Sequence, residues 1–195
     1  MSSFADVLAA ARKGDEDAFV VLFRSVQPAL LRYLRAVGGP LAEDVASDTW
    51  LSVVRSLSRF SGDEQGWRAW VFTIARARLH DEQRRAVRRP IPVDSELALD
   101  GEADPADVES IVEEGLATRA ALALVARLPR EQAEVVLLRH VVGLDVEHTA
   151  RVVGKRPGTV RVAAHRGLRR LSDLLGEARE LTAVRAGNAN DASGD

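Results

Sequence analysis

Residues 128–171 read LPREQAEVVLLRHVVGLDVEHTARVVGKRPGTVRVAAHRGLRRL, and this stretch decides the fold. Asp145 is a candidate N-cap for a short helix over 146–153. The run Gly154–Pro157 then predicts a tight turn, and its proline suits the first turn of a following helix. Residues 151–171 carry seven Lys or Arg and no Asp or Glu. A short helix, a turn and a basic second helix are the parts of a helix-turn-helix motif, which reads DNA.

The composition favours helices throughout the chain. The chain has 195 residues, of which 46% are hydrophobic, and Leu, Ala, Val, Arg and Glu dominate while Ile, Tyr and Thr are few. The absence of cysteine excludes disulfides, thiolate metal sites and cysteine nucleophiles. No apolar run approaches the roughly 20 residues of a membrane span. The first residues lack the basic start and apolar core of a secretory signal, so we expect a cytoplasmic protein without membrane insertion.

Charge is distributed in blocks, although the net charge is only −2. Residues 67–89 carry seven Arg against two acidic residues, whereas residues 94–114 carry nine acidic residues and no basic one. The basic stretch 151–171 follows. Two basic blocks separated by an acidic block point to nucleic acid more strongly than the total charge does.

The acidic block also divides the chain, because it lies in a segment that holds three of the seven prolines. We expect an all-α fold of two small helical domains. The first covers residues 1–89, an acidic flexible linker covers 90–115, a second domain with a C-terminal helix-turn-helix covers 116–175, and a disordered tail covers 176–195.

Spacings of three and four between apolar residues predict four helices in the first domain. They are 3–14, 15–38, 41–57 and 67–87. Pro28 should kink the second helix or delay its start. In the third helix, the residues expected to face inward are Val45, Trp50, Val53, Val54 and Leu57.

Short motifs in both domains resemble a sigma factor of bacterial RNA polymerase, and more narrowly the extracytoplasmic-function group, which keeps only regions 2 and 4. In the second domain they are Leu128-Pro129, Gly143-Leu144, Gly158-Thr159-Val160-Arg161, Arg166 and Leu171. In the first domain they are Gly14-Asp15, Ala18-Phe19, Ala42-Glu43-Asp44-Val45, Trp70 and Ile74-Ala75-Arg76. Their order and spacing over roughly residues 5–175 make the resemblance specific.

The resemblance implies that the last helix reads a −35 promoter element in duplex DNA. Arg161, Val162, His165 and Arg166 could share a face at a major groove, where Arg can donate two hydrogen bonds to guanine. Lys155, Arg156 and Thr159 lie at the turn and helix start, which favour phosphates. A merely solvated basic helix face is the alternative. The pair Val162-Ala163 departs from the family pattern, so the promoter sequence stays open.

The fourth helix would capture the unpaired −10 strand. The candidate residues are Trp67, Arg76, Arg78, Arg84, Arg85 and Arg88. Arginine suits phosphates because it is planar and always charged, and an indole ring can stack on a base. Core packing is the alternative for the tryptophans, and it is favoured for Trp70 and evenly balanced for Trp67. Ala77 stands where the family often has Asn.

The third helix would bind core RNA polymerase through Asp44, Asp48 and Trp50, although an ordinary acidic face would look the same. The resemblance also implies an anti-sigma factor as a partner and places the acidic linker in the RNA exit path. It implies no catalytic residue and no cofactor. The four histidines show no metal-ligand spacing. Two other functions stay open: a one-component helix-turn-helix regulator, and a helical adaptor that binds acidic protein partners.

Overall fold

The computed structural model describes residues 3–88 and 120–191, with side chains described for 3–86 and 120–177. Every regular element in these ranges is helical, which confirms the all-α expectation. The expected linker over 90–115 lies outside the described residues.

The N-terminal domain consists of four α-helices and two short 3-10 turns. They are α1 (Phe4–Arg12), α2 (Glu16–Gly38), η1 (Gly39–Leu41), α3 (Ala42–Ser56), η2 (Leu57–Arg59) and α4 (Glu64–Arg88). Ser3 and Asp6 form a capping box on α1, and Asp15 caps α2. Pro28 lies inside α2 and does not delay its start. The fourth helix begins earlier than predicted, because Asp63 Oδ1 accepts the backbone N–H of Gly66 at 2.8 Å and so caps it.

The C-terminal domain holds a helical segment over 120–126 and the helix-turn-helix. Its elements are α6 (Arg130–Val136), a π-helical turn η4 (Leu137–Val141), α7 (Val146–Val153) and α8 (Pro157–Asp191). A disordered tail was predicted from residue 176, whereas α8 continues to Asp191. Residues 177–185, EARELTAVR, are mostly strong helix formers, which accounts for the extension.

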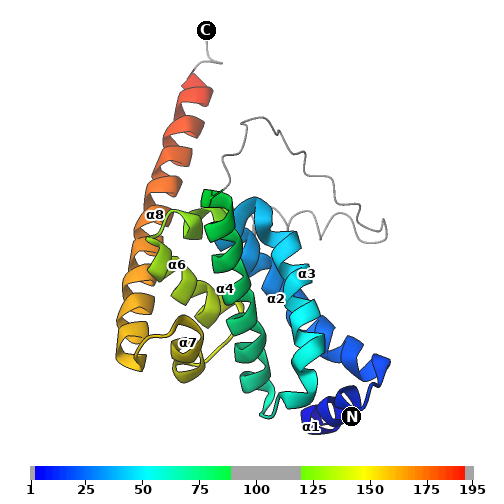
Figure 1. Cartoon of the computed structure of the whole chain (residues 1–195). Coiled ribbons are helices and arrows are strands. Elements are labelled where there is room, and N and C mark those ends of the chain that lie inside the picture. Colours follow the sequence, from blue (N-terminus) through cyan, green and yellow to red (C-terminus); the bar gives the residue numbers. More distant parts are fainter. Residues whose placement is uncertain (1–2, 89–119, 192–195) are drawn as a thin grey trace.

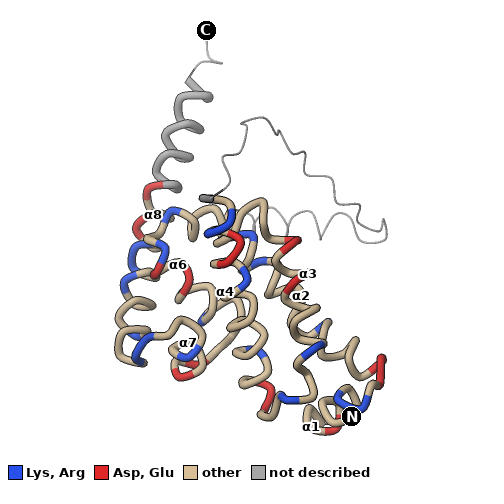
Figure 2. Tube along the Cα trace, in the orientation of Figure 1, with Lys and Arg blue, Asp and Glu red and all other residues tan. Residues whose placement is uncertain are grey.

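The two domains lie side by side, and α6 and α7 fill the space between α4 and α8 (Figure 1). Contacts cross from α4 to α7 and from α2 to α6 and η4. The C-terminal end of α8 extends beyond the rest of the molecule (Figure 1). Lys and Arg occur along both α4 and α8, so each domain carries its own basic helix (Figure 2).

Aromatic residues form much of the N-terminal core. Tyr33 of α2 meets Phe72 of α4 edge-on, with ring centroids 5.3 Å apart. Phe60 contacts both Trp67 and Trp70, at centroid distances of 5.5 and 4.9 Å. Such pairs contribute about 0.5–1.5 kcal/mol each beyond the area they bury, so this cluster fixes α4 against the loop before it.

Candidate nucleic-acid interface

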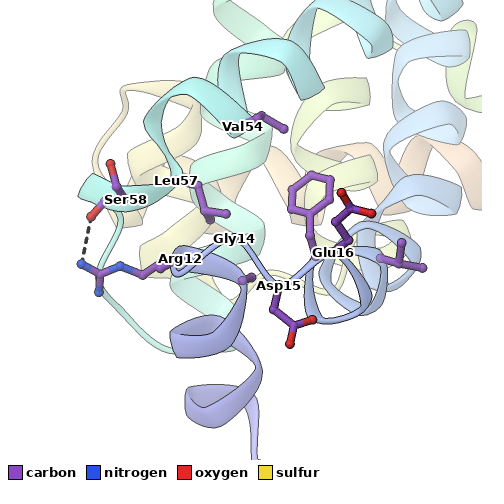
Figure 3. Close-up of a pocket in the computed structure, with 10 residues that line it drawn as sticks. Arg12, Gly14, Asp15, Glu16, Val54, Leu57 and Ser58 are labelled. Atoms are coloured by element: carbon purple, nitrogen blue, oxygen red, sulfur yellow. Dashed lines mark hydrogen bonds between the residues drawn. The ribbon is translucent and has the colours of Figure 1, made fainter.

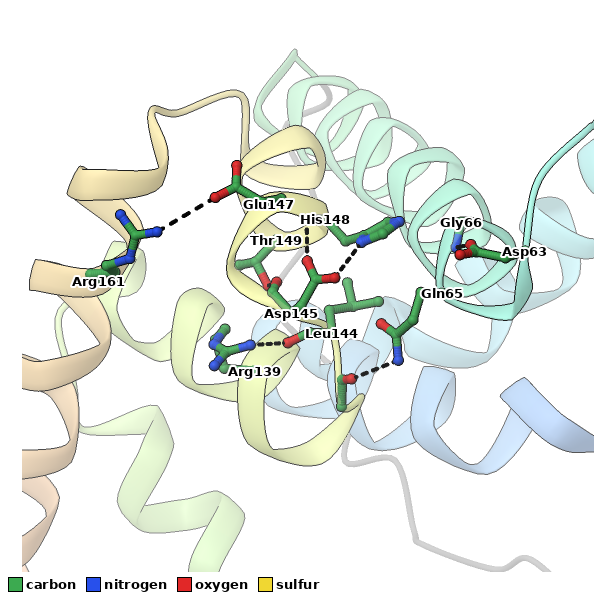
Figure 4. A network of polar contacts seen from close by, with 11 residues as sticks. Asp63, Gln65, Gly66, Arg139, Leu144, Asp145, Glu147, His148, Thr149 and Arg161 are labelled. Carbon is green, nitrogen blue, oxygen red and sulfur yellow. Dashed lines mark hydrogen bonds and ion pairs between the residues drawn. The ribbon is translucent and has the colours of Figure 1, made fainter.

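Local sequence signals fix both ends of α7: a side-chain cap at its start and a left-handed glycine after its end. Asp145 Oδ1 accepts the N–H of His148 at 2.7 Å, and its other oxygen lies 2.8 Å from His148 Nδ1 (Figure 4). The backbone hydrogen bond from His148 holds the pKa of Asp145 below its ordinary value. At the other end, Gly154 adopts a left-handed conformation with φ 68°, which a glycine adopts without steric cost. The expected cap and turn are therefore both present.

The inner face of α8 packs on α6 and α7. Val160 and Ala163 are buried there, and Gly167 lies at the crossing with α6. A Cβ atom on Gly167 would lie 2.7 Å from Val136 Cγ2, so only glycine fits at this approach. The close crossing fixes which face of α8 is turned to solvent.

The outer side of α8 and the turn before it carry all seven residues expected to read the −35 element. Each is exposed: Lys155, Arg156, Thr159, Arg161, Val162, His165 and Arg166. Two of the cations have carboxylate partners in the same domain. Lys155 Nζ lies 3.4 Å from Glu131, and Arg161 lies 3.5 Å from Glu147 (Figure 4). Exposed pairs of this kind contribute about 0–1 kcal/mol, so DNA can displace them at little cost.

The arginines of α4 do not share one environment. Arg84 and Arg85 are exposed and pair only with acidic neighbours one turn away. Arg78 is partly buried and donates to Ser52 Oγ at 2.9 Å. The side chain of Arg88 lies outside the described ones. Of the candidates for the −10 strand, Arg84 and Arg85 thus have largely exposed side chains, at 74% and 67%.

Arg76, another candidate for the −10 strand, faces the C-terminal domain in this structure. Its Nε donates to Glu134 Oε1 of α6 at 2.7 Å, and the two side chains are only 28% and 12% exposed. Tyr33 donates its hydroxyl to the same oxygen at 2.9 Å. Burial first, and the charge of Glu134 second, raise the pKa of Tyr33 well above its ordinary value.

Both tryptophans pack in or against the core, in line with core packing as the alternative to base stacking. Trp67 is fully buried, whereas Trp70 is partly buried and packs on Phe60 and Trp67. Trp67 is thus the deeper of the two, which spacing along one helix cannot show. With its ring in the core, Trp67 offers no free surface for a base to stack on.

Two family models match this chain, one in each domain. The family model for sigma-70 region 2 matches residues 22–89, and that for sigma-70 region 4 matches residues 118–171. The ECF RNA polymerase sigma factor SigD of Mycobacterium tuberculosis is 35% identical over 176 residues, which cover 87% of this chain and 82% of SigD. The chain is an ECF sigma factor of the sigma-70 family. It directs RNA polymerase in transcription initiation.

Two further proteins resemble this sigma factor. BldN of Streptomyces coelicolor, also an ECF RNA polymerase sigma factor, is 35% identical over 167 residues, which cover 85% of this chain and 63% of BldN. The structure of the sigma factor RpoE in complex with the anti-sigma factor NepR from Bartonella quintana aligns with a TM-score of 0.59 at 21% identity, covering 85% of this chain and 98% of RpoE. The family sets aside the one-component regulator and the adaptor as alternatives.

The acidic face of α3 in this sigma factor is present, but Trp50 is not part of it. Asp44 and Asp48 are exposed. Trp50 is 8% exposed, packs on Phe23 at a centroid distance of 4.7 Å, and donates its indole N–H to Gln27 at 2.6 Å. The indole is therefore a core side chain and offers little area to a partner.

The sigma factor has exposed apolar side chains on α2 and α3 that the sequence did not predict. Val54 was expected to face inward but is 56% exposed, and Leu51 of α3 and Val21 of α2 are exposed to a similar extent. The surface adjoins a pocket of about 530 Å³ that Phe19, Val54 and Leu57 line (Figure 3). The spacing was a signal of this surface, because residues 51 and 54 are one turn apart on α3.

Two absences hold for the described residues of the sigma factor. None of the described helices is both long and apolar enough to cross a membrane. No group of three or more His, Asp or Glu in the same ranges is arranged to hold a metal ion.

Proposed function

We propose that the sigma factor contacts promoter DNA at two points, with α8 reading a −35 element in duplex DNA and α4 capturing the unpaired −10 strand. The observation that carries this proposal is the exposed outer face of α8. Arg161, Val162, His165 and Arg166 lie on that face, directly after a capped α7 and a left-handed turn. A helix held in this way presents its first turns to the major groove.

On α4, the exposed Arg84 and Arg85 would contact phosphates of the −10 strand. Arg76 would join them once it is released from Glu134. Unstacking a base costs a few kcal/mol, and binding of the strand along a basic helix would offset that cost. The sigma factor contributes binding energy to promoter melting, and the polymerase performs the polymerisation chemistry.

Core RNA polymerase would bind α3. Asp44 and Asp48 supply charge, and the exposed apolar side chains of Leu51 and Val54 on the same helix supply area to bury. Apolar patches rimmed by charged residues are typical protein–protein interfaces. The sigma factor RpoE forms a complex with the anti-sigma factor NepR. An anti-sigma factor that covered the apolar surface of the present chain would compete with polymerase for it.

Run-off transcription tests the proposal. Purified core polymerase and the sigma factor are mixed with fragments of the host genome, and the transcripts are mapped. Starts that depend on the sigma factor, with a shared sequence upstream, are the expected result, and their absence would sink the proposal.

A single substitution then tests the assignment of α8. Arg161→Ala should reduce initiation at these promoters by roughly tenfold or more, because a bidentate contact to guanine contributes about 1–3 kcal/mol. Binding to core polymerase should not change. Arg127→Ala removes an equally exposed arginine away from the reading face and serves as the matched control. If Arg161→Ala weakens polymerase binding and initiation together, α8 does not have the proposed role.

A further inference from the structure

Glu147 of α7 lies beside the face of α8 that carries Arg161. Its Oε1 atom is 3.5 Å from Arg161 Nη2, and both side chains are 63% exposed. The pair joins the two helices of the helix-turn-helix motif (Figure 4). A carboxylate at this place weakens the attraction for DNA, because the phosphates of the duplex carry the same charge. Its presence beside a DNA-reading arginine therefore points to a second effect that offsets this one.

The local sequence offers Glu147 another partner. Arg151 follows it by four residues on α7, and this order and spacing of Glu and Arg favour an ion pair within one helix. In the described part of the chain, the ion pair of Glu147 is nevertheless with Arg161 on the next helix. The carboxylate is thus directed across the turn toward α8.

The backbone on both sides of this pair is held in place. Asp145 caps α7, and Thr149 donates its hydroxyl to the carbonyl of Asp145 at 2.7 Å. On α8, the residue before Arg161 is Val160, which is buried. Glu147 and Arg161 therefore project from fixed positions, and only their side chains have to be ordered for the pair to form.

A guanidinium group can hold a carboxylate and a base at the same time. It has five N–H donors in one plane, and a guanine accepts two of them through O6 and N7. The remaining donors of Arg161 can stay with Glu147, so guanine does not have to displace the carboxylate. An arginine that is already held loses less side-chain freedom when it binds, which makes the base contact more favourable.

The second ion pair at the start of α8 is of a different kind. Lys155 Nζ lies 3.4 Å from Glu131 of α6. An ammonium group is a point charge on a flexible stem, so it does not define the plane of a base contact. Lys155 precedes α8, at the place expected to meet phosphates, which carry no sequence information. The two glutamates, 54% and 63% exposed, thus have the same charge but cations with different tasks.

Glu147 also lies in the first turn of α7, where an acidic residue stabilises a helix. That role alone would affect the stability of α7 and leave the choice of bases unchanged. A role through Arg161 would instead change the preference at the single base that Arg161 reads. The two roles can therefore be separated by measuring base preference one position at a time.

We propose that Glu147 is a positioning residue for promoter recognition, which orients Arg161 toward a guanine of the −35 element and so sharpens the base preference at that position without contacting DNA itself. In DNA with another base at this position, Glu147 keeps Arg161 from turning to a neighbouring phosphate, which discriminates against wrong sites. The proposal rests on the proposed function, because it requires that Arg161 reads the −35 element.

The test uses holoenzyme reconstituted from core polymerase and the full chain. A promoter mapped by run-off transcription is rebuilt as a set of templates in which each base of the −35 element is varied singly, and the transcripts from each template are counted. The proteins compared are the wild type, Arg161→Ala, Glu147→Gln and Glu131→Gln. Glu131→Gln removes the same charge beside Lys155 and is the matched control. The Tm of each variant reports on its folding.

Arg161→Ala should abolish the preference for guanine at one position. Glu147→Gln should reduce the preference at that same position by about threefold to tenfold, since an arginine that is no longer held has to be ordered on binding. Glu131→Gln should change transcription from all templates by a similar factor and leave each base preference as in the wild type. A double variant with Arg161→Ala and Glu147→Gln should have the base preferences of Arg161→Ala alone, because Glu147 acts only through Arg161.

Three outcomes would overturn the proposal. Unchanged base preferences in Glu147→Gln would leave only the helix-stabilising role, and a change at a different position would mean that Glu147 contacts a base itself. An equal loss of preference in Glu131→Gln would show a general effect of charge.

The wild type and Arg161→Ala separate these outcomes from failure of the proposed function. If the wild type gives no starts, or if Arg161→Ala lowers transcription from all templates alike, the assignment of α8 to the −35 element is refuted. If Arg161→Ala removes one base preference and Glu147→Gln does not weaken it, only the positioning by Glu147 is refuted.

Discussion

Gly167→Ala tests how closely α8 must approach α6. The added Cβ would lie 2.7 Å from Val136 Cγ2 and 3.4 Å from Gln132 Cβ. Carbon atoms in good contact are about 3.5–4.0 Å apart, so the two helices would have to move by about 1 Å. Val136 cannot simply swing away, because it is buried and a β-branched side chain in a helix has one strongly preferred rotamer.

Two opposing effects set the size of the change. Overpacking of this kind costs about 1–3 kcal/mol. Alanine in a helix interior is about 1 kcal/mol more favourable than glycine, which offsets part of the cost. We therefore expect Gly167→Ala to lower the free energy of unfolding of the C-terminal domain by up to about 2 kcal/mol, which corresponds to a fall in Tm of up to about 15 °C for a domain of this size.

Gly176→Ala is the matched control, because it lies on the same helix with nothing within 4 Å of its Cβ position. It should raise stability by about 0.5–1 kcal/mol. Circular dichroism follows both domains, whereas tryptophan fluorescence follows the N-terminal one, since Trp50, Trp67 and Trp70 all lie there. If Gly167→Ala and Gly176→Ala stabilise the chain equally, the close crossing of α6 and α8 is wrong.

Three other measurements test separate parts of the structure. Asp145→Ala should cost about 1 kcal/mol at neutral pH. Because the pKa of Asp145 is lowered in the folded chain, this difference should be full above about pH 4 and should shrink as pH falls through the folded pKa, which denaturation at several pH values would show. Tyr33 is the single tyrosine, and because its pKa is raised, ultraviolet absorbance should show no ionisation until the pH is well above about 10. The contact between Tyr33 and Glu134 should be lost as the pH rises through that folded pKa. Glu134→Gln should lower the pH at which half of Tyr33 is ionised, because it removes a nearby negative charge. Val54→Asp should weaken binding to core polymerase by about tenfold or more without lowering Tm, because it places a charge in an apolar contact, and unchanged binding would remove α3 from the polymerase interface.

Local signals in the sequence predicted the helix-turn-helix well. Asp145 caps α7, Gly154 takes the left-handed turn, and α8 begins at Pro157. Each of these depends on the chemistry of one or two neighbouring residues, and the preference is strong enough to be read without tertiary information. The exposure of Arg161 and Val162 follows from the period of the buried residues on the same helix.

Predictions failed where two faces of a helix are both apolar. Val53 and Val54 are adjacent on α3, and one is fully buried while the other is 56% exposed. Periodicity gives the width of an apolar stripe but not which edge of it meets the core. The same limit left the relative depths of Trp67 and Trp70 unpredicted, and packing against Phe60 in the loop before α4 accompanies the burial of Trp67.

The environment of Arg76 shows a different limit of prediction from sequence. The side of α4 that holds Gln65, Arg68, Arg76 and Gln83 also holds Phe72 and Leu79, so the sequence does not show whether its polar residues meet solvent, DNA or another domain. In the structure it meets another domain. Arg76 pairs with Glu134, which lies 58 residues away in the sequence, and Tyr33 donates to the same oxygen. Periodicity describes one helix at a time, so it cannot identify a partner on an element that is distant in the sequence. The partner of a polar side chain is therefore set by tertiary packing, which is why the environment of Arg76 could not be predicted.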